Sequence, residues 1–167
     1  DIVRADDSRR VVVVSAAGKR DKNDHKITDL LYLCHAHLQY GVSCDGIYDM
    51  IRSRYVAIRD ALGLTTPLEA EFAALREKMD KGISADELVS RGEYFAAELM
   101  ADYLGFDFLD SSLWLKFKLD GTAKEALQQI HDKQYTLPFA SDSRKLFKVG
   151  VNFSKETRGI EGWIVED

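Results

Sequence analysis

Apolar residues recur at helical spacing through the first two thirds of the chain. This spacing predicts helices over residues 25–40, 45–62 and 67–80, and Gly63 and Gly82 are suited to end the second and third. The pattern then continues beyond residue 84, so a fourth helix is expected there.

The start of this fourth helix carries a capping-box pattern, in which the Ser84 hydroxyl and the Glu87 carboxylate satisfy each other's free backbone donors. We expect the helix to bend or break near Arg91-Gly92 and to stop at Gly105.

Short apolar runs predict strands on both sides of the helices. Arg10–Ser15 is a continuous β-branched run, which is typical of a strand buried on both faces of a parallel sheet. Phe106–Leu109 and Leu113–Lys118 are further expected strands. Near the C-terminus, Leu146–Phe153 and Gly159–Val165 are separated by turn residues and indicate an antiparallel hairpin.

A last helix is expected over Thr122–Lys133, before the hairpin. Together these elements predict an α/β fold, a layered sandwich of helices on a mainly parallel central sheet with a C-terminal β-hairpin. The 167 residues suggest one domain, or one domain with a small appendage.

Composition adds limits on partners. The chain is 46% hydrophobic and 31% charged, with a net charge of −5, which does not favour nucleic acid as a partner. No apolar run has membrane-spanning length, so we expect no membrane contact and a cytoplasmic location. Cys34 and Cys44 fit two reduced, buried thiols, and because His35 and His37 would point in different directions on a helix, we expect no metal site.

The first part of the chain, about residues 1–115, resembles aspartokinase of the amino-acid kinase superfamily. Three segments carry the resemblance, and their order and separation match the family: Val11 to Lys19, Lys26 to Leu31, and Ser84 to Tyr94. The resemblance implies an open α/β sandwich that transfers the γ-phosphoryl group of ATP to the β-carboxylate of L-aspartate.

By the same resemblance, Ser15 and Thr28 would contact the aspartate substrate and Glu93 would bind its α-amino group. Fixed polar groups of this kind can orient a small zwitterion. Two alternatives remain open: that Ser15 only satisfies backbone groups at a strand end, and that Glu93 caps a helix that restarts after the expected break.

Several family features are absent from these 167 residues. The opening Lys-Phe-Gly-Gly strand, which neutralises and holds phosphate, is missing, and so are the later nucleotide motif and the regulatory domains. We therefore expect weak L-aspartate binding without catalysis and no cofactor, since ATP and Mg²⁺ would be needed only by a working kinase.

From residue 116 to 167 the chain is similar to the C-terminal end of PD-(D/E)XK nuclease-like domains of AAA-ATPase-associated bacterial proteins. The segments that carry this similarity are Phe117 to Ala123, Ala126 to Ile130, Asp132 to Tyr135 and Lys148 to Trp163. Both families share a Phe-Lys-x-Asp-Gly-Thr pattern, and in a recombined chain this pattern would mark the join near Lys116–Thr122.

In this nuclease family an Asp and a Glu-x-Lys bind a divalent metal and activate water. Lys118 falls on the motif lysine, but Lys116 occupies the Glu position, which replaces a metal ligand with a positive charge. Gln129 and Tyr135 would be supporting residues of the same remnant.

Three hypotheses follow: an aspartokinase-like region without its nucleotide half, a nuclease-like protein that binds nucleic acid, and a recombined, non-catalytic interaction protein. In the third, regions 1–115 and 116–167 would pack as one unit, with the Leu113–Lys118 strand paired to strands of both. The sequence leaves open whether the fusion is natural and whether the chain forms a homodimer through an exposed sheet edge.

Overall fold

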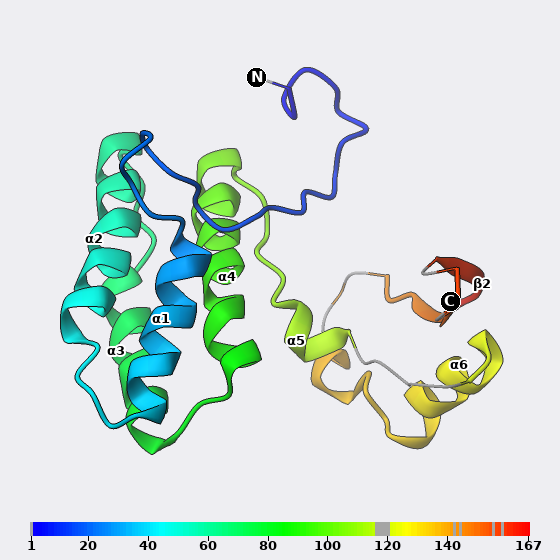
Figure 1. The fold of residues 1–167 in the computed structure, drawn as a ribbon. Coiled ribbons are helices and arrows are strands. Elements are labelled where there is room, and N and C mark those ends of the chain that lie inside the picture. Colours follow the sequence, from blue (N-terminus) through cyan, green and yellow to red (C-terminus); the bar gives the residue numbers. More distant parts are fainter. Residues whose placement is uncertain (1, 116–120, 142, 144, 155, 158) are drawn as a thin grey trace. The chain divides into compact units, whose positions relative to one another are not determined.

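The computed structural model describes residues 2–115, 121–141, 143, 145–154, 156–157 and 159–167. Its chain divides into two compact units, Asp1–Leu109 and Asp110–Asp167. Within the described residues, the first unit contains four long helices and the second contains short helices and a two-stranded sheet (Figure 1). The division predicted at residue 115 and the packing of both regions as one unit stay predictions.

The first unit contains the four helices that the spacing of apolar residues predicted. They are α1 (Ile27–Gln39), α2 (Asp45–Leu62), α3 (Leu68–Lys81) and α4 (Ala85–Leu104). The predicted cap of the fourth helix is present, because the Ser84 hydroxyl accepts a hydrogen bond from the backbone N–H of Glu87 at 3.1 Å.

The break expected near Arg91-Gly92 was wrong, because α4 runs without interruption to Leu104. Gly92 lies buried in the middle of this helix. A glycine weakens a helix interior, but tertiary packing can outweigh that cost, and here the absence of a side chain admits another segment of the chain.

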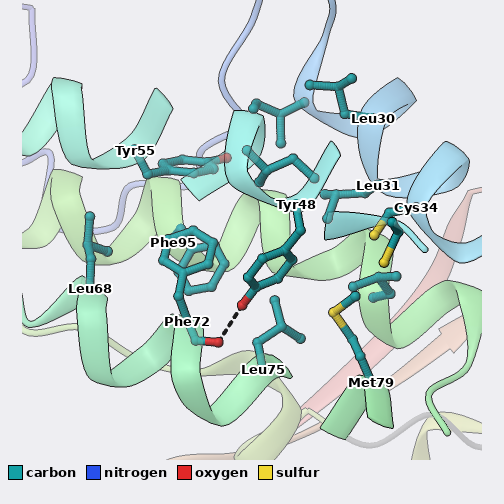
Figure 2. Packing of buried hydrophobic residues seen from close by; sticks show 14 of the residues in the cluster. Leu30, Leu31, Cys34, Tyr48, Tyr55, Leu68, Phe72, Leu75, Met79 and Phe95 are labelled. Carbon is teal, nitrogen blue, oxygen red and sulfur yellow. Dashed lines mark hydrogen bonds between the residues drawn. The ribbon is translucent and has the colours of Figure 1, made fainter. Parts of the chain in front are cut away.

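The core of the first unit lies between the four helices, with α1 packed against both α2 and α4. Figure 2 shows its centre, where Phe72 stacks on Phe95 with ring centroids 4.2 Å apart. The Tyr55 ring packs at a tilt against both of these rings. The Tyr48 hydroxyl donates to the backbone carbonyl of Phe72, so the phenol is buried without losing its polar partner. Cys34 and Met79 fill the other end of the core.

Two of the expected strands form no β-ladder within the described residues. Val11–Ser15 runs as extended chain, with Val11 and Val13 86% and 91% exposed while Val12 and Val14 are half-buried. Phe106–Leu109 is also unpaired. A strand needs a neighbour to satisfy its backbone groups, and the prediction that Val11–Ser15 is buried on both faces was therefore wrong.

The third expected strand, Leu113–Lys118, is also different in the structure. Its first residues belong to the short helix α5 (Ser111–Trp114), whose N-cap is Asp110. The Asp110 carboxylate accepts from the backbone N–H of Ser112 at 2.9 Å, and this local bond favours a helical turn over an extended chain. Residues 116–118 lie outside the described residues.

The second unit confirms the C-terminal helix and hairpin. Helix α6 (Ala123–Asp132) begins with a reciprocal capping box between Thr122 and Glu125, and a 3-10 turn, η1 (Leu137–Phe139), follows it. Strand β1 (Lys148–Phe153) pairs antiparallel with β2 (Ile160–Glu166).

Helix α6 packs on this hairpin at Gly150, which lies against the Ala123 carbonyl and the Leu127 backbone. Any side chain at residue 150 would overlap the helix, so the glycine allows the close approach. Across the same contact, Nε2 of His131 lies 3.0 Å from a carboxylate oxygen of Glu166.

The structure thus shows a mixed, mainly helical chain with a small antiparallel sheet at its C-terminal end. The described residues contain no mainly parallel central sheet, which the α/β sandwich prediction required. Among them, no helix combines the length and apolar character needed to cross a bilayer.

Candidate functional site

The backbone N–H and C=O of Ala17 both make hydrogen bonds to the helices and hold this part of the chain in place. The N–H of Ala17 donates to the Tyr55 hydroxyl at 3.4 Å, and that hydroxyl donates to the carbonyl of Gly92 at 2.7 Å. The carbonyl of Ala17 accepts from the N–H of Ile27 at 3.3 Å. One backbone position therefore connects the extended segment to α1, α2 and α4.

Close packing at Gly92 brings the same elements together. A Cβ at this glycine would lie 2.8 Å from the Cβ of Ala16, 3.2 Å from Leu31 Cδ1 and 3.4 Å from Ile27 Cγ2. Since real Cβ atoms essentially never approach at 2.8 Å, only glycine permits this packing without a shift of the chain.

Each of the three predicted aspartate-binding residues is next in sequence to a residue of this contact. Ser15 precedes Ala16, Thr28 follows Ile27, and Glu93 follows Gly92. Helices α1 and α4, which carry Thr28 and Glu93, lie side by side (Figure 1). Each predicted residue is therefore the sequence neighbour of one of the residues that pack together at Gly92.

The surroundings of the three residues bear on the alternatives for them. Ser15 and Glu93 are exposed and Thr28 is half-buried, so all three can meet a ligand from solvent. Within the described part of the chain the Ser15 hydroxyl makes no hydrogen bond, which leaves the role at a strand end unsupported. Glu93 lies in the interior of the continuous helix α4, so the helix-capping role predicted as an alternative was wrong.

A buried charge cluster holds the loop between Ser15 and Thr28. Arg54 donates to the carbonyls of Gly18 and His25 at 2.9 and 3.3 Å and to the Asp24 carboxylate at 2.6 Å. Arg20 donates to the same carboxylate at 2.9 Å. Hydrogen bonds from Arg20, with a further charge interaction from Arg54, hold the pKa of Asp24 well below its usual range.

The Tyr55 phenol lies at the centre of this arrangement and is fully buried. Its pKa is raised to about 12, chiefly by burial, while the Ala17 hydrogen bond opposes the rise and the negative charge of Glu93 adds to it. The phenol therefore stays protonated and can keep donating to Gly92 at any physiological pH.

The sequence patterns assigned no role in the site to Arg54, Tyr55 or Gly92. Arg54 and Tyr55 are part of the helical pattern of α2, and Gly92 read as a helix break. The only available signal was a cation in the apolar stripe of a helix, which indicates a buried charge with a partner elsewhere.

In the second unit, two of the three nuclease-like remnant residues come together. The side-chain amide of Gln129 donates to the Tyr135 hydroxyl at 3.3 Å, next to the C-terminal end of α6. Lys118, the third, lies outside the described residues. Over those residues, no group of three or more His, Cys, Asp or Glu side chains is placed to hold a metal ion.

The two cysteines lie together in the core of the first unit. Both thiols are free and buried, and burial followed by a hydrogen bond with Cys44 raises the pKa of Cys34 to about 12. Because both side chains are buried among apolar residues, this pair acts as core packing.

Comparisons with known proteins confirm both resemblances. Residues 112–163 match the family model of the PD-(D/E)XK nuclease superfamily. The crystal structure of an aspartate kinase from Clostridium acetobutylicum matches with a TM-score of 0.70 and 33% sequence identity. The match covers 80% of this chain and 31% of the kinase chain, so this chain spans about a third of that enzyme's length. No curated protein matches the chain.

Proposed function

We propose that the first unit binds L-aspartate weakly at Ser15, Thr28 and Glu93 without phosphorylating it. One observation carries the proposal: the neighbours of all three residues meet at Gly92, where a Cβ would lie 2.8 Å from that of Ala16. The likeness to an aspartate kinase supports the choice of ligand.

The chemistry of the three side chains suits this amino acid. The Glu93 carboxylate can accept hydrogen bonds from the α-ammonium group, and such charge-assisted bonds are stronger than neutral ones. The hydroxyls of Ser15 and Thr28 can donate to the carboxylates of the ligand. Because Ser15 and Glu93 are exposed, solvent competes with each bond, and weak affinity is the expected result.

Phosphoryl transfer is not proposed, because these 167 residues contain no Lys-Phe-Gly-Gly sequence to neutralise and hold the phosphates. The chain accordingly needs neither ATP nor Mg²⁺ for the proposed role. Cytoplasmic location, and the origin of the chain as a fusion of a kinase-like and a nuclease-like region, belong to the same proposal.

Titration of the full chain with L-aspartate, followed by amide chemical shifts, tests the binding. We expect saturable shifts at residues 15–17, 28 and 93, with D-aspartate producing weaker ones. Glu93→Gln keeps the shape but removes the charge, and should weaken binding about tenfold or more.

Glu77→Gln is the matched control, because Glu77 is also an exposed helical glutamate but lies on α3 and pairs with Lys81. It should bind L-aspartate as the unchanged chain does. Absence of shifts at millimolar L-aspartate, or equal weakening by both variants, would contradict the proposal.

A second candidate function concerns the tail, where the Gln129–Tyr135 contact and the family match favour a nuclease-like remnant. We propose that this remnant does not cleave nucleic acid, because Lys116 occupies the position of a metal-binding carboxylate.

A further inference from the structure

We infer that Tyr55 is a positioning residue for the Ser15, Thr28 and Glu93 site, an inference that rests on the proposed binding function. Its hydroxyl is shared by two backbone groups, accepting from the Ala17 N–H at 3.4 Å and donating to the Gly92 carbonyl at 2.7 Å. Ala17 lies two residues from Ser15, and Gly92 is next to Glu93.

The bridge joins segments that are distant in the sequence. The extended segment near Ser15 has no β-ladder within the described residues, so its backbone must be fixed by other partners. Tyr55 supplies one such partner from α2, and the Ala17 carbonyl is held in turn by the N–H of Ile27. Thr28 is the next residue, so the same bridge reaches the third residue of the site.

Arg54, adjacent to Tyr55, extends the anchoring along the loop. Its guanidinium donates to the carbonyls of Gly18 and His25. The phenol therefore fixes the chain directly after Ser15, and the guanidinium fixes the loop that leads to Thr28. Tyr55 itself is fully buried and does not reach solvent, so it acts through other residues and not on the ligand.

The structure offers a matched control in Tyr48, which lies two helical turns earlier on the same face of α2. Tyr48 is also buried, and its hydroxyl also donates to a backbone carbonyl, that of Phe72. Phe72 belongs to α3, which carries none of the three site residues. Replacing either tyrosine with phenylalanine removes one buried hydroxyl and keeps the ring in the core.

The experiment compares Tyr55→Phe and Tyr48→Phe in the full chain by L-aspartate titration and by hydrogen exchange of backbone amides. We expect similar losses of stability in both variants. Only Tyr55→Phe should weaken L-aspartate binding, by about five- to tenfold, because only this change releases Ala17 and Gly92. Only this variant should accelerate exchange at the Ala17 amide, by about tenfold relative to Tyr48→Phe.

Equal weakening of binding by both variants would overturn the inference, because it would show an effect of stability alone. If the unchanged chain does not bind L-aspartate, the proposed function fails, and the exchange data then decide only whether Tyr55 holds the chain after Ser15. Faster Ala17 exchange confined to Tyr55→Phe would show that it does, and unchanged exchange would refute it.

Discussion

Arg54 and Asp24 form an ion pair inside the first unit, with Nη2 2.6 Å from Oδ1 and the two side chains only 4% and 6% exposed. The partners come from α2 and from the loop before α1, so the pair ties that loop to the bundle. Leaving one partner of a buried pair without the other is strongly destabilising. The pair should therefore govern how the stability of the first unit responds to acid.

Asp24→Asn should lower the free energy of unfolding at neutral pH and reduce its dependence on acid. The pKa of Asp24 is lowered in the folded chain, so its contribution to stability is present above the unfolded pKa of about 4 and is lost as pH falls through the folded value. Urea unfolding between about pH 2 and 7 measures both effects.

Asp21→Asn serves as the control, because Asp21 is exposed in the same loop and loses the same charge. It should leave the acid dependence nearly unchanged. Parallel pH curves for the Asp24→Asn variant and the unchanged chain would show that the ion pair does not control acid stability.

Gly92→Ala should destabilise the chain, although alanine is the better helix former. A glycine to alanine change inside a helix normally stabilises by about 0.5–1 kcal/mol. Here the new methyl group would overlap Ala16 and press on Leu31, and overpacking costs about 1–3 kcal/mol. The net change should be a lower thermal midpoint.

Gly46→Ala gives the opposite case, because Gly46 lies in α2 and, among the described residues, nothing outside its chain neighbours and its own helix backbone comes within 4 Å of the position a Cβ would take. We expect an unchanged or slightly higher midpoint for this variant. A stabilising effect of Gly92→Ala would mean that the extended segment does not pack on α4.

The two cysteines should resist alkylation in the folded chain. Burial raises the pKa of Cys34 to about 12, and both thiols are inaccessible, so iodoacetamide at pH 8 should modify neither at an appreciable rate. Mass spectrometry should show two modifications once urea unfolds the chain. Rapid labelling of either cysteine without denaturant would argue against the packing shown in Figure 2.

The chain should form no aspartyl phosphate with Mg-ATP, because no Lys-Phe-Gly-Gly sequence is present to hold the phosphates. Trapping with hydroxylamine would detect the acyl phosphate, with an intact aspartate kinase as the positive control. Hydroxamate formation that requires Glu93 would refute the proposed lack of catalysis.

Plasmid DNA should survive incubation with the chain in Mg²⁺ or Mn²⁺. In the proposed alignment Lys116 stands where the family has a metal-binding carboxylate, so we expect no metal-bound hydroxide to form. Gel electrophoresis measures the cleavage. Activity that disappears in Lys118→Ala but persists in Lys124→Ala would instead identify Lys118 as a working motif lysine.

The helices were predictable because their determinants are local. The stops at Gly63 and Gly105 adopt the left-handed conformation that ends α2 and α4, and the Ser84 cap forms as the sequence indicated. The same holds for the C-terminal helix and hairpin. Each signal acts within a few residues, so no knowledge of the rest of the fold was needed.

Pairing and close packing were decided by the tertiary structure. The β-branched run Val11–Ser15 has strand propensity, but whether it enters a ladder depends on a neighbour that local sequence does not specify. Gly92 carried a local signal for a helix break, yet it lies within a continuous helix because Ala16, far away in the sequence, packs against it.

The candidate site also depends partly on sequence motifs and partly on tertiary structure. The sequence by itself identified Ser15, Thr28 and Glu93 through a family resemblance, since motif residues are visible in a linear chain. The contacts of Arg54 and Tyr55 beside these residues arise from hydrogen bonds between residues about 30 to 40 positions apart. Such contacts form only when the helices have packed, because the partners share no local pattern.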